Sequence, residues 1–122
     1  MQALQTVFTD AENGFLNQMG VNVLRELKVY GRVAWGARTL AGSDAISSPW
    51  KYISVRRLAL HIEESLRQGL QWAVFEPNDI ELWERLKRDI GAYLTNVWRT
   101  GALFGVVDQQ AFYVKCDEEL NP

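Results

Sequence analysis

The chain has 122 residues, of which 48% are apolar and five are tryptophan, and this is enough for about one domain with a core of its own. A formal net charge of −2 and a pI near 5.4 give no basic footprint of the kind that nucleic-acid binding favours. The longest apolar runs are far shorter than a membrane span, no secretory signal is visible at the start, and a single cysteine excludes an internal disulfide.

The first predicted element is a short helix near the start of the chain. Thr9 and Glu12 fit a capping box, in which the hydroxyl and the carboxylate satisfy backbone N–H groups at the helix start. A helix is therefore expected over residues 10–19, with Gly20 as its left-handed end.

Two extended segments and a loop come after this helix. Residues 21–27 alternate between apolar and polar side chains, which indicates a strand or an extended entry segment. Residues 29–37 predict a better strand, bounded by glycines. The polar residues at 41–49 predict a loop of about ten residues, a length that is common in binding or contact loops.

The next region predicts an amphipathic helix and a buried strand. Ser54 is the expected N-cap and Gly69 the expected end of the helix. Its apolar side chains recur at helical spacing: Val55, Leu58, Ala59, Ile62, Leu66 and Leu70. The short apolar run at residues 71–76 contains β-forming residues and predicts a buried strand.

The last third predicts a long helix and a final strand. Asn78 is the expected N-cap, with Glu81 completing a capping box, and the apolar periodicity predicts a helix over residues 79–100. Residues 103–107 are expected to be extended. The alternation at residues 111–116 predicts a half-buried strand.

The predicted fold class is α/β (α+β), with a small mixed β-sheet and two main helices packed on it. The element order is helix, strand, strand, helix, strand, helix, strand, and helices that connect strands predict such a layered arrangement. In this interpretation residues 33–35 and 72–75 are the central strands.

No constellation of side chains predicts catalysis, a cofactor or a metal. His61 is the only histidine, and Ser65 lies one helical turn beyond it, so the two form a nominal base and nucleophile pair. A structural or surface role for His61 explains this spacing more simply. Cys116 is expected in the core as a small hydrophobic side chain, and one histidine and one distant cysteine cannot form a four-ligand zinc site.

Charged residues on the two long helices suggest surface roles. The basic residues Arg85 and Arg88 are interleaved with acidic ones, which predicts the ion pairs Glu81–Arg85 and Glu84–Arg88. The candidate inter-subunit residues flank loops or helix starts and are less needed by the core: Trp50, Arg56, Arg57, Glu76 and Asn78. Local capping and solvated charge explain these five residues equally well.

Several sequence blocks, in the same order, carry a resemblance to a known family. They include Leu16-Asn17 with Gly20-Val21-Asn22-Val23, the tract Val33-Ala34-Trp35-Gly36-Ala37-Arg38-Thr39-Leu40, the run that starts at Trp50-Lys51-Tyr52, and Phe75-Glu76-Pro77-Asn78-Asp79. Over residues 15–122 the chain resembles the C-terminal domain of contractile tail sheath proteins, which occur in phage tails and related injection particles.

This resemblance implies a structural role and no enzymatic one. Sheath proteins stack as rings or a helix around a rigid inner tube, and contraction drives the tube through a target envelope. Neighbouring subunits are joined by strand exchange, in which terminal arms add to the sheet of this domain. The implied partners are copies of the chain itself, the inner tube protein, and baseplate and terminator proteins, with no nucleic acid and no direct membrane insertion.

The resemblance also implies a domain layout and a location. Residues 1–20 are expected to be an N-terminal helix and linker segment, and residues 21–122 a sheath C-terminal core domain that lacks the N-terminal domains and the C-terminal arm. The expected location is a virion tail or a contractile injection particle, including a type VI secretion-like one, assembled in the bacterial cytoplasm. The alternative is a non-enzymatic α/β protein-interaction module with a different partner.

Overall fold

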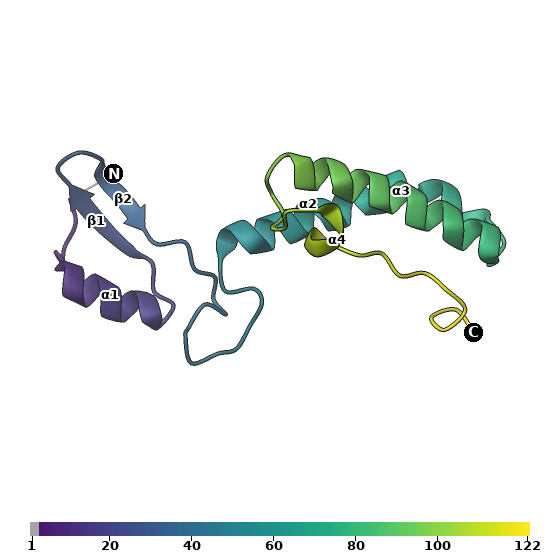
Figure 1. The fold of residues 1–122 in the computed structure, drawn as a ribbon. Helices are drawn as coiled ribbons and strands as arrows, with labels where there is room; N and C mark the ends of the chain where they lie inside the picture. Colours follow the sequence, from purple (N-terminus) through teal and green to yellow (C-terminus); the bar gives the residue numbers. More distant parts are fainter. Residues whose placement is uncertain (1–2) are drawn as a thin grey trace. The chain divides into compact units, whose positions relative to one another are not determined.

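The computed structural model describes residues 3–122, and these residues form two compact units that divide after His61. We refer to them as the N-terminal unit (up to residue 61) and the C-terminal unit (from residue 62). The N-terminal unit contains a helix, a β-hairpin, a long loop and the first part of a second helix, in which the division falls, whereas the C-terminal unit is helical (Figure 1).

The first helix, α1 (Asp10–Gln18), begins at the predicted capping box. The N–H of Glu12 donates to Oγ1 of Thr9 at 3.3 Å, and the N–H of Thr9 donates to Oε2 of Glu12 at 2.8 Å. Gly20 lies just beyond the helix with φ of 87°, in the left-handed region that glycine adopts without strain. The predicted helix is confirmed to within one residue at its end.

The hairpin consists of β1 (Val23–Leu27) and β2 (Gly31–Trp35), which pair antiparallel with Val23 opposite Trp35. A three-residue turn joins them, and Gly31 has φ of 68°, as such turns commonly require. Helix α1 contacts β1, and Val23, only 4% exposed, is the one buried hydrophobic side chain among the described residues. No third strand joins this sheet within residues 3–122.

Two long helices and two short ones make up the rest of the fold. After helix α2 (Ile53–Gly69) come the 3-10 helix η1 (Gln71–Phe75), the long helix α3 (Ile80–Arg99) and the short helix α4 (Asp108–Ala111), which contacts α3. Ser54 lies inside α2 rather than at its N-cap, so that predicted cap is wrong.

The predicted strand at residues 71–76 is wrong, because this segment is the 3-10 helix η1. Local hydrogen bonds define it: the N–H of Ala73 donates to the carbonyl of Leu70 at 3.0 Å, and the N–H of Glu76 donates to the carbonyl of Ala73 at 3.2 Å. Periodicity alone does not distinguish a short apolar run in a strand from one in a helix. Here the run joins two helices directly.

The predicted strand at residues 111–116 is also wrong, although its two faces were predicted correctly. Helix α4 ends at Ala111, and the residues after it pair with no strand in the described chain. Phe112 and Val114 are half-buried, whereas Tyr113 is 87% exposed. The mixed α and β class is confirmed, but the sheet has two antiparallel strands and neither residues 33–35 nor residues 72–75 form a central strand.

Candidate functional site

A polar network closes the long loop between β2 and α2 in the N-terminal unit. The backbone of the loop is pinned at its base, where Arg38 and Tyr52 form an isolated antiparallel bridge. The N–H of Thr39 donates to the carbonyl of Lys51 at 3.0 Å, and Oγ1 of Thr39 donates to the carbonyl of Trp50 at 2.5 Å. The two ends of the loop therefore lie side by side.

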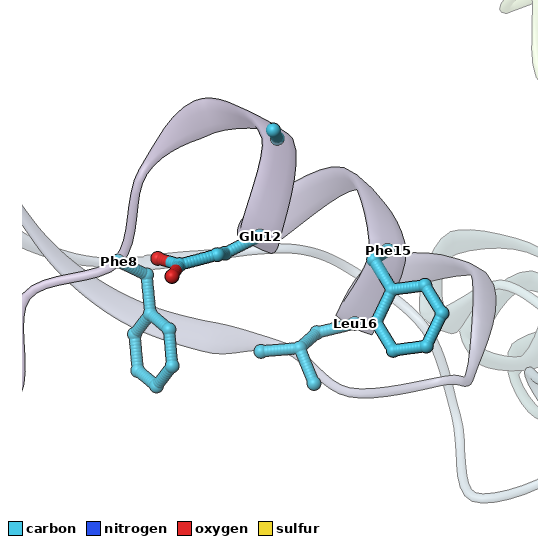
Figure 2. A pocket seen from close by; sticks show the side chains of 5 residues that line it. Phe8, Glu12, Phe15 and Leu16 are labelled. Atoms are coloured by element: carbon cyan, nitrogen blue, oxygen red, sulfur yellow. The ribbon is translucent and has the colours of Figure 1, made fainter.

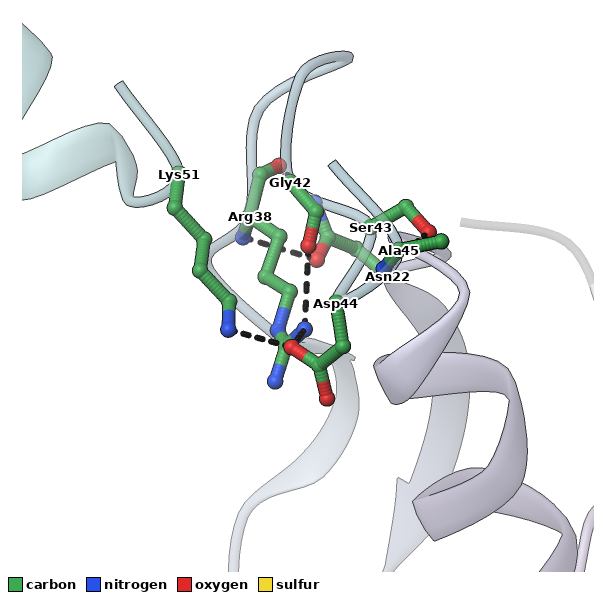
Figure 3. A network of polar contacts seen from close by, with 7 residues as sticks. All are labelled: Asn22, Arg38, Gly42, Ser43, Asp44, Ala45 and Lys51. Carbon is green, nitrogen blue, oxygen red and sulfur yellow. Dashed lines mark hydrogen bonds and ion pairs between the residues drawn. The ribbon is translucent and has the colours of Figure 1, made fainter. Parts of the chain in front are cut away.

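Side chains complete this closure, and we call Asn22, Arg38, Gly42, Asp44 and Lys51 the loop clasp (Figure 3). The Asn22 amide donates to the Arg38 carbonyl at 2.7 Å and accepts from the Arg38 N–H at 2.9 Å. Nη1 of Arg38 donates to the Gly42 carbonyl at 2.9 Å and to Oδ1 of Asp44 at 2.6 Å. Asp44 also forms an ion pair with Lys51.

The clasp combines charge compensation with close packing. Hydrogen bonds from Lys51 and then Arg38 lower the pKa of Asp44, because they stabilise its carboxylate form. A Cβ atom on Gly42 would lie 2.7 Å from Cβ of Arg38 and 2.7 Å from the Thr39 carbonyl oxygen. Only glycine fits this position without displacing its neighbours.

Aromatic and basic side chains surround the clasp. The Arg56 guanidinium lies 4.7 Å from the Trp50 ring centroid, and Arg38 and Lys51 each lie 5.7 Å from the Tyr52 ring centroid. These distances are typical of cation–π contacts. Trp50 is 40% exposed, so this aromatic surface is accessible.

The position of Arg56 and Arg57 is unfavourable for α2 itself. Both lie close to its N-terminal end, and its first turn has no acidic residue. The helix macrodipole favours anions at that end by about 0.3–1 kcal/mol and disfavours cations. Arg57 forms no ion pair with any described residue. Helix stability therefore gives no reason for this pair of cations.

The other two predicted interface residues lie near the start of α3 in the C-terminal unit. The predicted cap at Asn78 is wrong: Asp79 caps α3, accepting the N–H of Leu82 at 2.9 Å. Asn78 instead accepts Nε1–H of Trp83 at 2.7 Å. Glu76 helps to line an open pocket of about 250 Å³.

The predicted ion pairs Glu81–Arg85 and Glu84–Arg88 on α3 are wrong, because both arginines have different partners. Arg85 lies 3.8 Å from the Trp72 ring centroid. Nζ of Lys87 lies 2.5 Å from Glu84, and Arg88 lies 3.4 Å from its neighbour Asp89. Sequence spacing cannot reveal that an aromatic side chain in η1 competes for an arginine in α3.

The structure thus brings Trp50 and Arg56 into contact, with Arg57 adjacent in sequence. Glu76 and Asn78 belong to the other unit. Sequence reasoning missed the loop clasp, although the Gly42-Ser43-Asp44 turn within a polar loop was a visible signal.

Sequence reasoning also missed an apolar hollow on α1 (Figure 2). It has a volume of about 460 Å³ and is lined by Phe8, Ala11, Glu12, Phe15 and Leu16. Phe15 is 65% exposed, and the spacing of these side chains along one helix face was the available signal.

No enzymatic, metal or membrane signal emerges from the described residues. No hydrogen bond joins His61 to Ser65 there, and no group of three or more metal-ligating side chains comes together within residues 3–122. None of the described helices has the length and apolar character that crossing a membrane requires.

Comparison with known proteins identifies the family. Residues 46–122 match the model of the phage tail sheath C-terminal domain. The chain belongs to this family. The resemblance to contractile tail sheath proteins in the sequence is thereby confirmed.

Relatives of this sheath domain extend the likeness beyond the matched residues. The chain is 33% identical over 112 residues to the tail sheath protein of Vibrio phage KVP40, covering 92% of this chain and 15% of that protein. A chain in the baseplate of the anti-feeding prophage is 35% identical, with a TM-score of 0.80. A chain in the contracted PVC sheath complex, an extracellular contractile injection system, is 30% identical, with a TM-score of 0.78.

The sheath domain corresponds to part of these proteins. Each of the two structural matches covers 96% of this chain and 34% of the other. The chain therefore spans about a third of the solved chains and about a seventh of the phage protein that it matches.

Proposed function

We propose that this chain is a structural, non-enzymatic part of a contractile sheath subunit. In this proposal, residues 21–122 are the core domain and residues 1–20 are a lead-in segment with its own helix. Copies polymerise in stacked rings or a helix around an inner tube, and contraction drives the tube through a target envelope. Membership of the sheath C-terminal domain family supports this role.

The observation that carries the proposal is the unpaired hairpin. Strands β1 and β2 pair only with each other in the described chain, so their outer edges present N–H and C=O groups without a ladder partner. Such edges accept a further strand, and an isolated two-stranded hairpin is at best marginally stable in water. Strands from the arms of neighbouring subunits would complete the sheet.

Exposed apolar side chains support burial in a larger assembly. On the hairpin, Val29 is 85% and Tyr30 67% exposed, and in the C-terminal unit Phe75 is 96% and Phe104 99% exposed. Large exposed apolar side chains in both units are consistent with contact surfaces for protein partners. The proposed partners are further copies, the inner tube, and baseplate and terminator proteins, with no nucleic acid and no membrane insertion.

Among the candidate interface residues, those near the clasp have the stronger support. Arg56 and Arg57 lie at the end of α2 where the helix macrodipole disfavours cations, and Trp50 presents an accessible ring beside Arg56. Glu76 is exposed and suits the same role. Asn78 holds Trp83, so its contribution to an interface is indirect.

The proposed location rests on the relatives. The sheath proteins that match this chain belong to a phage and to injection particles. We infer a place in a virion tail or a contractile injection particle, with assembly in the bacterial cytoplasm.

The proposal can be tested by electron microscopy of the natural full-length protein, expressed alone and together with its candidate tube protein. We expect hollow striated tubes of uniform diameter. Amide exchange of residues 23–35 should slow on assembly, because a third strand would protect the outer edges. Dispersed particles at every salt concentration would instead favour the alternative, an interaction module for another partner.

A pair of proline variants sharpens the test of strand addition. In an antiparallel ladder, successive residues present their N–H alternately to the partner strand and to the outer edge. Of Val33→Pro and Ala34→Pro, one therefore removes a hairpin hydrogen bond and the other leaves the hairpin intact. We expect the variant that keeps the hairpin to lose assembly, and normal tubes from it would overturn strand addition at β2.

A further inference from the structure

The two units carry opposite net charges. Up to His61 the sequence has seven lysine and arginine residues and four aspartate and glutamate residues, which gives a formal charge of +3. From Ile62 onward it has six basic and eleven acidic residues, which gives −5. The overall charge of −2 hides this separation.

The excess positive charge of the N-terminal unit lies on three side chains. All four acidic residues of this unit are engaged: Asp10 by Arg25, Glu26 by Arg32, Asp44 by the clasp, and Glu12 by the backbone of Thr9. The cations without an acidic partner in the described chain are Lys28, Arg56 and Arg57. Arg56 and Arg57 are adjacent in sequence, and Arg56 lies over the exposed ring of Trp50.

The excess negative charge of the C-terminal unit gathers near the start of α3. Glu76, Asp79 and Glu81 lie within six residues of one another, and all three are exposed. The C-terminal segment brings in Glu118, which lines an open pocket of about 580 Å³ together with Asp79 and Glu81. None of these four carboxylates forms an ion pair with a described residue.

We propose that the basic surface around Arg56 and Arg57 of one copy docks on the acidic surface of Glu76, Asp79, Glu81 and Glu118 of a second copy. This inference rests on the proposed sheath function and names a contact within it. Because the two surfaces differ, the contact is heterologous, and such contacts propagate into rings or open helices instead of stopping at a dimer. Opposite charges across the contact fix its register and oppose wrong pairings.

A second copy is the occupant that the charges favour. Both surfaces occur on the same chain, each is unbalanced within its own unit, and the basic one carries an aromatic ring and arginines, which are frequent interface anchors. The unpaired cations are too few for a nucleic-acid footprint, and the net negative charge of the chain would repel such a ligand.

Charge reversal with mixing tests the contact. One variant carries Arg56→Glu and Arg57→Glu, so that both surfaces are acidic. Another carries Glu76→Lys, Glu81→Lys and Glu118→Lys, which leaves only the helix cap Asp79 acidic, so that the acidic surface becomes basic. We expect each variant alone to lose assembly by at least about tenfold in sedimentation at low salt. An equimolar mixture should assemble, because every contact between unlike variants again joins opposite charges.

Three controls make each outcome decisive. Arg99→Glu changes a cation outside both surfaces and should assemble normally. The rescue in the mixture also demonstrates that both variants fold. Assembly of the wild type should weaken as salt rises to about 0.5 M, because salt screens exposed charges.

The failure of this contact is distinguishable from failure of the proposed function. If the wild type forms no assembly at any salt concentration, the sheath proposal fails and the contact with it. If the wild type assembles and each reversed variant alone assembles equally well, only the contact is overturned. Loss in both variants without rescue on mixing, while circular dichroism shows that both are folded, also overturns the contact.

Discussion

The two units differ in how far apart in the sequence their hydrogen-bonded residues lie. In the N-terminal unit, Asn22 and Arg38 are bonded across 16 positions of sequence, and Arg25 reaches the carbonyl of Phe8 across 17. In the C-terminal unit the side-chain bonds are more local: Arg67 donates to Glu64 across three positions, and Trp98 donates to the carbonyl of Gly105 across seven. The N-terminal unit therefore depends on a few long-range polar contacts, whereas the C-terminal unit depends on regular helices that tolerate single changes.

The largest expected effect comes from Gly42→Ala in the N-terminal unit. The added Cβ would meet Arg38, the Thr39 carbonyl and, at 2.9 Å, the Lys51 carbonyl, none of which can move without opening the loop. Overpacking of this kind typically costs about 1–3 kcal/mol, and we expect a loss near the upper end. Amide exchange resolved by residue should show the loss in the N-terminal unit alone.

Gly14→Ala is the matched control for Gly42→Ala. Gly14 lies in α1 of the same unit, and a methyl group added there would meet no atom within 4 Å apart from its neighbours in the helix. Alanine should stabilise the helix by about 0.5–1 kcal/mol. Equal effects of the two substitutions would show that crowding at the loop does not limit stability.

A second, smaller loss is expected from Asn22→Ala. The substitution removes both hydrogen bonds between the Asn22 amide and the backbone of Arg38. Leaving a backbone N–H and C=O without partners costs about 1–3 kcal/mol when water cannot replace them fully, and we expect about 2 kcal/mol. Chemical denaturation monitored by tryptophan fluorescence measures it.

Gln18→Ala serves as the control for Asn22→Ala, because the exposed Gln18 side chain lies nearby in sequence and makes no clasp contact. It should change the free energy of unfolding by less than about 0.5 kcal/mol. A neutral Asn22→Ala would mean that the loop stays closed through its backbone bridge alone.

The C-terminal unit should respond in the opposite direction to a glycine substitution. Gly91 lies within α3, and a methyl group there would meet no atom within 4 Å apart from its neighbours in the helix. Gly91→Ala should therefore stabilise this unit by about 1 kcal/mol, since glycine is a poor helix former. Thermal unfolding and amide exchange of α3 check the sign, and a destabilised α3 would contradict the tolerance inferred for this unit.

The contrast between the units also explains which features were predictable from the sequence. Helix α1 with its Thr9–Glu12 box and the long α3 were predictable because their signals are local. The Trp72–Arg85 stack and the loop clasp were not, because they depend on which side chains meet after folding. The predicted strands at 71–76 and 111–116 failed for a related reason: a strand requires a partner, and only the fold supplies one.

The same limit applies to the candidate site. The cations Arg56 and Arg57 were identifiable from sequence as a surface pair, and the structure adds that they lie at the end of α2 where the helix macrodipole disfavours cations. Asn78 was identifiable only as a polar residue before a helix. In the structure Asn78 accepts a hydrogen bond from Trp83, and the next residue, Asp79, is the helix cap. Sequence rules for helix starts do not resolve a difference of one residue.

The smallest expected effect concerns acid sensitivity and compares one carboxylate from each unit. Hydrogen bonds from Arg67 and then Gln68 lower the pKa of Glu64 to about 2, and hydrogen bonds from Lys51 and then Arg38 lower the pKa of Asp44. A depressed pKa in the folded state stabilises the protein above the unfolded pKa, and this contribution disappears as pH falls through the folded pKa. For Glu64 the contribution is complete above about pH 4.5 and is lost as the pH approaches about 2.

Both carboxylates are exposed, so solvent screens these ion pairs and their effect on stability is small. Carboxyl chemical shifts in an NMR titration should place the midpoint of Glu64 well below the usual range for glutamate, and Arg67→Gln should return it toward that range. The two units should then differ in their response to protonation. Protonating Glu64 weakens its bonds to Arg67 and Gln68, which lie within one turn of the same helix, whereas protonating Asp44 releases two cations that hold opposite ends of a loop. We therefore expect amide exchange at acid pH to rise first in residues 38–52, and simultaneous exchange in both units would contradict the difference in range between their polar contacts.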